Sequence, residues 1–188
     1  MKMKFFGILC LLLCQSLAQA TEPAPIDRLF PGKFPLGSGE LNSFMFKLYD
    51  IALWAENKSC AETFSCNMAL QTVQNWGAGR EKLVSKTLEK IEKVHPKLDQ
   101  ATLEKYKGYL NSVYPEKLEA EDTIQILLEY GKKTPHIKFY HRSKKEGKYI
   151  LKGDIEDQKF SLCFFGIWLH PKTSYQKLRL TLLGKDKP

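Results

Sequence analysis

The most informative stretch of the chain lies near its C-terminus and reads FFGIWLHPKTS, residues 164–174. Its apolar side chains continue a helical pattern that begins at Phe160, and Asp157 stands where the N-cap of that helix is expected. The sequence that follows, Thr173-Ser174-Tyr175-Gln176, has the spacing of a capping box for another helix. The stretch therefore predicts two consecutive helices, with the aromatic side chains of the first one in the core.

Upstream of this stretch, hydrophobic periodicity divides the chain into further strands and helices. Residues 36–55 and 68–75 are strand-like, whereas residues 83–94 and 99–113 place apolar side chains at helical spacing. Residues 123–130, 136–142 and 148–152 read as the strands of an antiparallel meander. The order of strands, two helices, strands and two helices predicts an α+β domain, in which helices cover one face of a large antiparallel sheet.

The first twenty residues have the pattern of a secretory signal peptide. Lys2 and Lys4 precede an apolar run over residues 5–13, and Ala18-Gln19-Ala20 resembles a cleavage site. That apolar run is about half the ~20 residues that a membrane-spanning helix needs. We therefore expect a leader over residues 1–20, an irregular lead-in over residues 21–35 and one domain over residues 36–184, exported to the periplasm.

Composition excludes several classes of protein. Of 188 residues, 43% are hydrophobic and 12% aromatic, which is too rich for a disordered chain and sufficient for one core. The net charge of +8 arises from 29 basic and 21 acidic residues, a mixture that does not indicate a nucleic-acid binder. Many of the basic residues lie in a predicted hairpin over residues 132–152. This basic hairpin is either a solvated surface or a weak contact with an anionic envelope surface.

Three cysteines remain outside the predicted leader. Cys60 and Cys66 flank a short segment between two strand-like runs, and an exported protein meets oxidising conditions. They form a candidate disulfide, with two reduced surface thiols as the alternative. Cys163 reads as a small buried residue, because no adjacent basic group would favour a reactive thiolate.

Motifs for common catalytic chemistry are missing from the sequence. The four histidines lack the spacing of metal ligands, so we predict no metal site. No serine stands in a nucleophile elbow, and no glycine-rich phosphate loop is present. We therefore predict no cofactor.

The C-terminal stretch, together with Leu178-Arg179 and Leu182-Leu183-Gly184, resembles the signature of the chalcone isomerase-like family, and within it the exported bacterial branch. The sequences LGSG (residues 36–39) and KLYDIALW (residues 47–54) are similar to the glycine turn and the long strand of that family. The resemblance covers roughly residues 35–184. It implies an open-faced β-sandwich, with helices packed on one side of a large antiparallel sheet.

The resemblance also indicates where a ligand cleft would lie. Plant enzymes of the family cyclise a chalcone to a flavanone, using an arginine, a threonine and a tyrosine to polarise the carbonyl group. Their arginine falls near Glu40 here, and their threonine near Tyr49. A polar residue on their first helix falls near Lys86, and a late serine or threonine corresponds to Thr173 or Ser174. These five residues are the ligand-cleft candidates.

The substitution at the arginine position argues against the enzyme's own reaction. A carboxylate at Glu40 in place of a cation would disfavour an anionic phenolate. The family also has a fatty-acid-binding branch, and Tyr49, Lys86 or Arg179 are candidates for contacts with a polar end group. We expect a non-catalytic domain that binds a small apolar or amphipathic ligand, such as a fatty acid. Two alternatives stay open: an isomerase of the intramolecular lyase type with an unknown substrate, and a structural or interaction protein of the cell envelope.

Overall fold

Six antiparallel strands form the main sheet of the computed structural model, which describes residues 23–43, 45–130 and 134–185. In space their order is β1 (Gly37–Ser43), β2 (Phe46–Ala55), β3 (Met68–Gln74), β6 (Thr123–Tyr130), β7 (Pro135–Arg142) and β8 (Ile150–Ile155). Two short strands, β4 (Ala78–Gly79) and β5 (Lys117–Leu118), pair with each other. The predicted fold class is confirmed. The predicted leader, together with Lys132 and Lys133 of the basic hairpin, lies outside the described residues.

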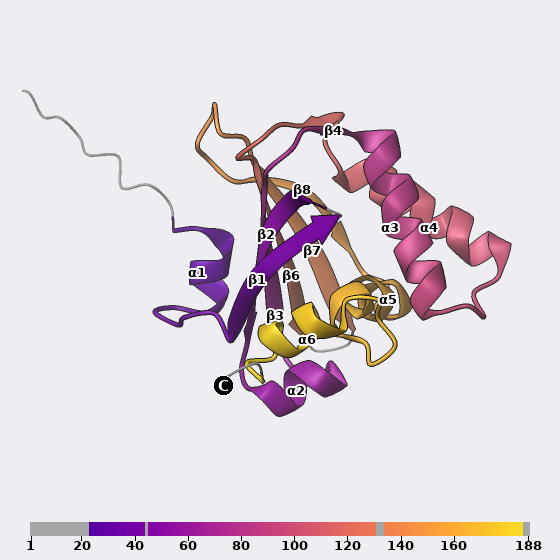
Figure 1. Ribbon diagram of the computed structural model, residues 1–188, viewed down its shortest axis with the longest axis horizontal. Coiled ribbons are helices and arrows are strands. Elements are labelled where there is room, and N and C mark those ends of the chain that lie inside the picture. Colours follow the sequence, from indigo (N-terminus) through magenta and orange to yellow (C-terminus); the bar gives the residue numbers. More distant parts are fainter. Residues whose placement is uncertain (1–22, 44, 131–133, 186–188) are drawn as a thin grey trace, which may run out of the picture.

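Four helices cover one face of this sheet (Figure 1). They are α3 (Arg80–Val94), α4 (Gln100–Val113), α5 (Gln158–Leu169) and α6 (Gln176–Leu182). A smaller helix, α2 (Lys58–Thr63), connects β2 to β3. The main core lies between the inner face of the sheet and these helices, so that face of the sheet is the one from which a site can be built.

Helix α5 occupies the centre of the core, as the apolar character of its sequence requires. Nine of its residues are buried, because it contacts β7 on one side and α3 on another. Gly166 permits the close approach of α3, since a Cβ atom there would lie 3.0 Å from Nε2 of His95. None of the helices formed by the described residues has both the length and the apolar character needed to span a membrane.

Two of the predicted helix caps form as expected, and one does not. Asp157 accepts a hydrogen bond from the amide of Phe160 at the start of α5, and Asp99 caps α4 in the same way. The predicted capping box is wrong, because α6 begins only at Gln176. There the side chain of Gln176 donates to the carbonyl of Thr173, while the hydroxyl of Thr173 accepts from the amide of Tyr175.

The segment predicted as an irregular lead-in contains a short helix, α1 (Pro25–Leu29). It packs on the face of the sheet opposite α3–α6, where Ile26 and Phe30 contact Ala69 and Leu127 (Figure 1). Proline at the first helical position explains why a proline-rich segment can begin a helix. The outer face is therefore partly covered by a segment that precedes the predicted domain.

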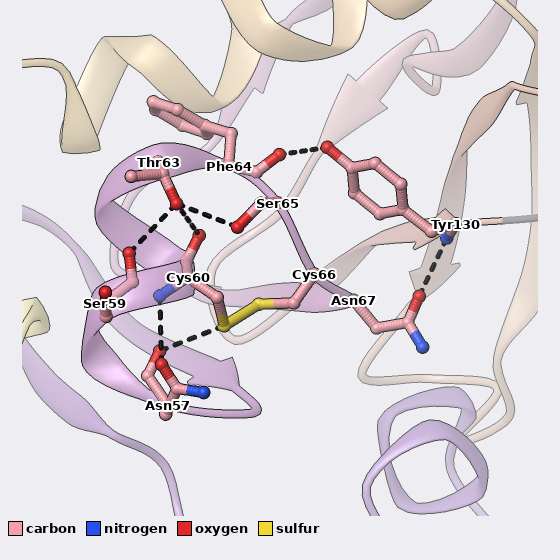
Figure 2. Close-up of a disulfide and its surroundings, with 9 residues drawn as sticks. All are labelled: Asn57, Ser59, Cys60, Thr63, Phe64, Ser65, Cys66, Asn67 and Tyr130. Atoms are coloured by element: carbon pink, nitrogen blue, oxygen red, sulfur yellow. Dashed lines mark hydrogen bonds between the residues drawn. A yellow bond between two sulfur atoms is a disulfide. The ribbon is translucent and has the colours of Figure 1, made fainter.

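A disulfide joins Cys60 in α2 to Cys66, which lies just before β3, and this is the pairing expected from the sequence (Figure 2). The joined segment is a helix, whose N-cap Asn57 accepts a hydrogen bond from the amide of Cys60. Glu56 lies close enough to both sulfurs to suggest a metal site. However, sulfurs that are bonded to each other are not thiolates and do not bind a metal as such.

Candidate functional site

A cleft with a volume of about 520 Å³ lies between the inner face of the sheet and helices α3 and α5. Its inner walls are apolar and include Leu41, Leu48, Leu83, Ile124, Phe164 and Ile167. Its mouth is formed by the lining residues that are exposed to solvent, namely Asn42, Ser43, Trp76, Gly77, Lys82 and Lys86. Among the described residues, no aspartate or glutamate lines the cleft. Such an apolar volume with few polar groups is typical of a small-molecule site.

The hydroxyl of Tyr49 is the first polar group inside the cleft. Tyr49 points to the inner face because it lies on the same side of β2 as the buried Ile51 and Leu53. Its oxygen accepts a hydrogen bond of 3.0 Å from Nε1 of the buried Trp168 in α5. Burial raises the pKa of Tyr49, although the hydrogen bond from Trp168 acts in the opposite direction. The phenol therefore stays protonated and can donate to a ligand.

The hydroxyls of Tyr114 and Thr87 form a second polar pair in the cleft. Tyr114 follows α4 and Thr87 lies on α3, and their oxygens are 3.1 Å apart. Burial raises the pKa of Tyr114 to about 12, and the hydrogen bond with Thr87 opposes that shift. Since one hydrogen bond uses one of the two hydroxyl hydrogens, the pair also retains a hydrogen for a ligand.

Three lysines of α3 provide the positive charge of the cleft. Lys82, Lys86 and Lys90 are four residues apart, so they lie along one side of the helix. Lys86 forms an exposed ion pair of 2.6 Å with Glu89, and Nζ of Lys90 lies 5.4 Å above the ring of Tyr175. Lys82 has no ion pair with any residue that the structure describes. The positive charge of the cleft therefore comes from α3, with Lys82 and Lys86 exposed at the mouth and Lys90 partly buried.

The structure brings two of the five predicted site residues to the cleft. Tyr49 lies inside it and Lys86 lies at its mouth. Thr173 is buried in the turn before α6, where it donates to the carbonyl of Ile167, and Ser174 is exposed next to it. Neither of these two residues lines the cleft.

Glu40 does not line the cleft either, which corrects the position expected for it. It lies opposite Asp50 in the β1–β2 pairing, one residue out of phase with the inward-facing Leu41 and Tyr49. Its side chain is therefore on the outer face, where it forms an ion pair of 2.9 Å with Lys47. The resemblance placed Glu40 on the correct strand but did not determine which face of the sheet its side chain occupies. A shift of one residue in the alignment moves every side chain of a strand to the other face.

Arg179, the remaining candidate for a polar contact, also lies outside the cleft. Its Nε donates to the carbonyl of Leu169 at 2.7 Å, and its guanidinium lies 3.5 Å from Glu62. Sequence reasoning instead missed Tyr114 and Thr87. A signal for Thr87 was present, because it interrupts the apolar side of the predicted helix over residues 83–94 with a hydroxyl group.

Three basic residues of the hairpin contact neighbouring side chains. Lys138 pairs with Glu129 at 2.7 Å, and Lys144 pairs with Glu121 at 2.5 Å. The guanidinium of Arg142 stacks 5.1 Å above a tyrosine ring. These contacts favour the interpretation of the hairpin as a solvated face.

Comparison with known proteins identifies relatives of this architecture. A profile described as chalcone isomerase-like matches residues 36–184. A solved structure of a fatty-acid binding protein from Arabidopsis thaliana superposes with a TM-score of 0.55 at 13% sequence identity. That similarity covers 79% of this chain and 85% of the other, and at this identity it shows the fold alone. A search of curated protein sequences finds no match.

Proposed function

Because the chain belongs to the chalcone isomerase-like family, we propose that its cleft binds one small apolar or amphipathic molecule, such as a fatty acid, without transforming it. The observation that carries this proposal is the cleft itself, whose volume of about 520 Å³ lies within the range of ligand pockets. The Arabidopsis protein of the same fold is named for fatty-acid binding, which supports this class of ligand.

The distribution of charge favours an amphipathic ligand with its apolar part inside. The inner end offers neutral hydroxyl and indole groups, whereas the cations stand at the mouth and along α3. Burying an anion beside neutral groups is unfavourable, and an anionic end is stabilised close to Lys82 and Lys86. A carboxylate ligand would therefore bind with its head at the mouth and its tail against Phe164 and Ile167.

The protonation of the two cleft tyrosines favours binding over proton abstraction. Tyr49 and Tyr114 both have raised pKa values, so neither is a base near neutral pH. General base catalysis needs a group whose pKa lies near the working pH. The isomerase alternative would therefore require a base from elsewhere.

The first experiment is recovery of a bound ligand. Native mass spectrometry of the purified protein, followed by solvent extraction, is expected to yield an amphiphile at one molecule per chain. Fluorescent fatty-acid binding then supplies a titration, and Leu83→Trp, which fills the cleft, should weaken it at least tenfold. Leu88→Trp is the matched control, because Leu88 is half-buried on the same helix but does not line the cleft. Absence of saturable binding, or equal loss in both variants, would refute the proposal.

We also propose that the protein is exported to the periplasm as a member of the bacterial branch of the family. The signal-like residues 1–20 support export, and so does the Cys60–Cys66 disulfide, because such bonds persist in oxidising compartments. Cell fractionation with thiol labelling tests this. The expected result is a periplasmic protein with one free thiol, whereas a cytosolic protein with three reactive thiols in the domain would contradict it.

A further inference from the structure

Three large apolar side chains are exposed together at the end of the sheet where the cleft opens. Met45 is 93% exposed, Phe46 57% and Trp76 55%. The first two lie at the turn between β1 and β2, and Trp76 follows β3. The rings of Phe46 and Trp76 meet edge to face at 5.6 Å, and Met45 directly precedes Phe46, so these three residues form one surface, here called the apolar rim.

The apolar rim borders the mouth of the cleft directly. Trp76 belongs to both, and it lies next to Gly77, which also lines the mouth. Figure 1 shows the end of β1 pointing toward α3, the helix that carries the lysines of the cleft. Phe34, which is 92% exposed, lies before the opposite end of β1, at a distance of roughly 20 Å along the strand. The rim is thus a local feature of the mouth.

Positive charge accompanies the apolar rim. Lys82 and Lys86 line the same mouth, and neither aspartate nor glutamate lines the cleft among the described residues. Two carboxylates lie nearby on α3: Glu89, which pairs with Lys86, and Glu81, which is exposed beside Lys82. Aromatic side chains next to lysines are the combination that partitions into the headgroup region of a membrane and is attracted by anionic lipids.

We propose that the mouth of the cleft docks on an anionic phospholipid bilayer, with the apolar rim inserted between headgroups and the α3 lysines against lipid phosphates. One supporting argument rests on the proposed function: an amphiphile that fits the cleft is held mainly in membranes, so docking by the mouth gives it a path that avoids water. The rim and the lysines support docking independently of that argument. In this proposal the bilayer contacts the mouth of the cleft and not the basic hairpin.

Flotation with vesicles tests this docking. Vesicles of phosphatidylcholine with phosphatidylglycerol should carry the protein upward, whereas pure phosphatidylcholine vesicles or high salt should weaken binding. The double substitution Met45→Ser with Phe46→Ser should lower the partition coefficient at least about tenfold, because two apolar side chains no longer leave water. Phe34→Ser removes an aromatic side chain that is more exposed than Phe46 but lies far from the mouth, and it should change partitioning less than twofold.

Charge variants locate the electrostatic contact. Lys82→Gln with Lys86→Gln should reduce binding to anionic vesicles several-fold, whereas Lys145→Gln with Lys148→Gln in the basic hairpin should not. The opposite result would assign membrane contact to the hairpin and overturn the proposal. In the wild type, tryptophan emission should shift to shorter wavelength on vesicle addition, and Trp76→Phe should abolish that shift although Trp54 and Trp168 remain.

Ligand binding in buffer without vesicles separates this inference from the proposed function. Met45 and Phe46 do not line the cleft, so their double variant should retain fatty-acid binding while it loses vesicle binding. Vesicle binding without any ligand binding would refute the proposed function alone. Equal flotation of the rim variant and Phe34→Ser would refute docking. A change in sedimentation of the rim variant without vesicles, together with unchanged flotation, would instead assign the rim to contacts between copies of the chain.

Discussion

Removal of the Tyr49 hydroxyl tests whether the Trp168–Tyr49 hydrogen bond holds the wall of the cleft. In Tyr49→Phe, the indole N–H of Trp168 loses its acceptor, which it meets at 3.0 Å, and Trp168 is only 7% exposed. A buried donor without a partner costs about 1–3 kcal/mol. For a domain of this size, each kcal/mol lowers the melting temperature by about 2–4 °C. We therefore expect a loss of about 4–8 °C for a cost near 2 kcal/mol.

Tyr114→Phe is the matched comparison, because it also removes one phenolic hydroxyl from the same cleft. Its partner, the Thr87 hydroxyl, can rotate to another acceptor, whereas the indole N–H has a fixed direction and can only donate. The cost should stay near 0.5–1.5 kcal/mol, which is the range of an ordinary hydrogen bond. Urea unfolding followed by tryptophan fluorescence measures both variants. Equal losses, or a larger loss for Tyr114→Phe, would show that the Trp168 hydrogen bond has no special role.

Three further predictions concern stability and reactivity. Gly37→Ala should lower the free energy of unfolding by at least about 3 kcal/mol, because its Cβ would lie 2.0 Å from a backbone oxygen of α6. Gly39→Ala should lower it by only about 1 kcal/mol, because its Cβ meets the tip of a leucine side chain. Similar unfolding midpoints for the two variants would contradict this. Asp122 is buried, and burial alone would raise its pKa, but hydrogen bonds from two backbone amides and His141 lower the pKa below its usual value. The contribution of the Asp122 carboxylate to the free energy of unfolding is therefore complete above about pH 4 and is lost as the pH falls further. Asp122→Asn should lower the free energy of unfolding by about 3 kcal/mol at pH 7 and approach the wild type in acid. Unfolding measured over an acid titration checks this. Burial raises the pKa of the Cys163 thiol, so a thiol reagent should label it only after denaturant is added, and rapid labelling of the native protein would refute its burial.

The sequence predicted the elements of the fold well where local physics controls them. The apolar side chains at alternate positions of residues 123–130 predicted a strand, and the apolar helical pattern around Phe164 predicted a buried helix. Asp157 and Asp99 marked helix starts because an aspartate side chain can accept an orphan amide there. The capping box predicted at Thr173 was wrong, because a threonine hydroxyl can also accept a hydrogen bond within a turn, and here that turn precedes α6.

The cleft was less predictable, since it depends on which parts of the chain meet across the core. Tyr49 and Trp168 are 119 residues apart in sequence, and no local pattern indicates that their polar atoms will be paired. Tyr114 lies in the segment after α4, where its direction depends on how that helix packs. The apolar rim was likewise hidden, because Phe46 and Trp76 are 30 residues apart in sequence and no local pattern indicates that their rings will meet.

Residues other than Glu40 make the inner end of the cleft unfavourable for a phenolate. Glu40 faces the outer side of the sheet, so its charge does not act on the cleft. The groups that act on the Tyr49 hydroxyl are Trp168, Tyr175 and Tyr114, and none of them is a cation. An anion at the inner end would therefore lose hydration without gaining an opposite charge, whereas the same anion at the mouth meets Lys82 and Lys86. The cleft consequently favours an amphiphile whose charged end remains at the mouth, beside the lysines of α3.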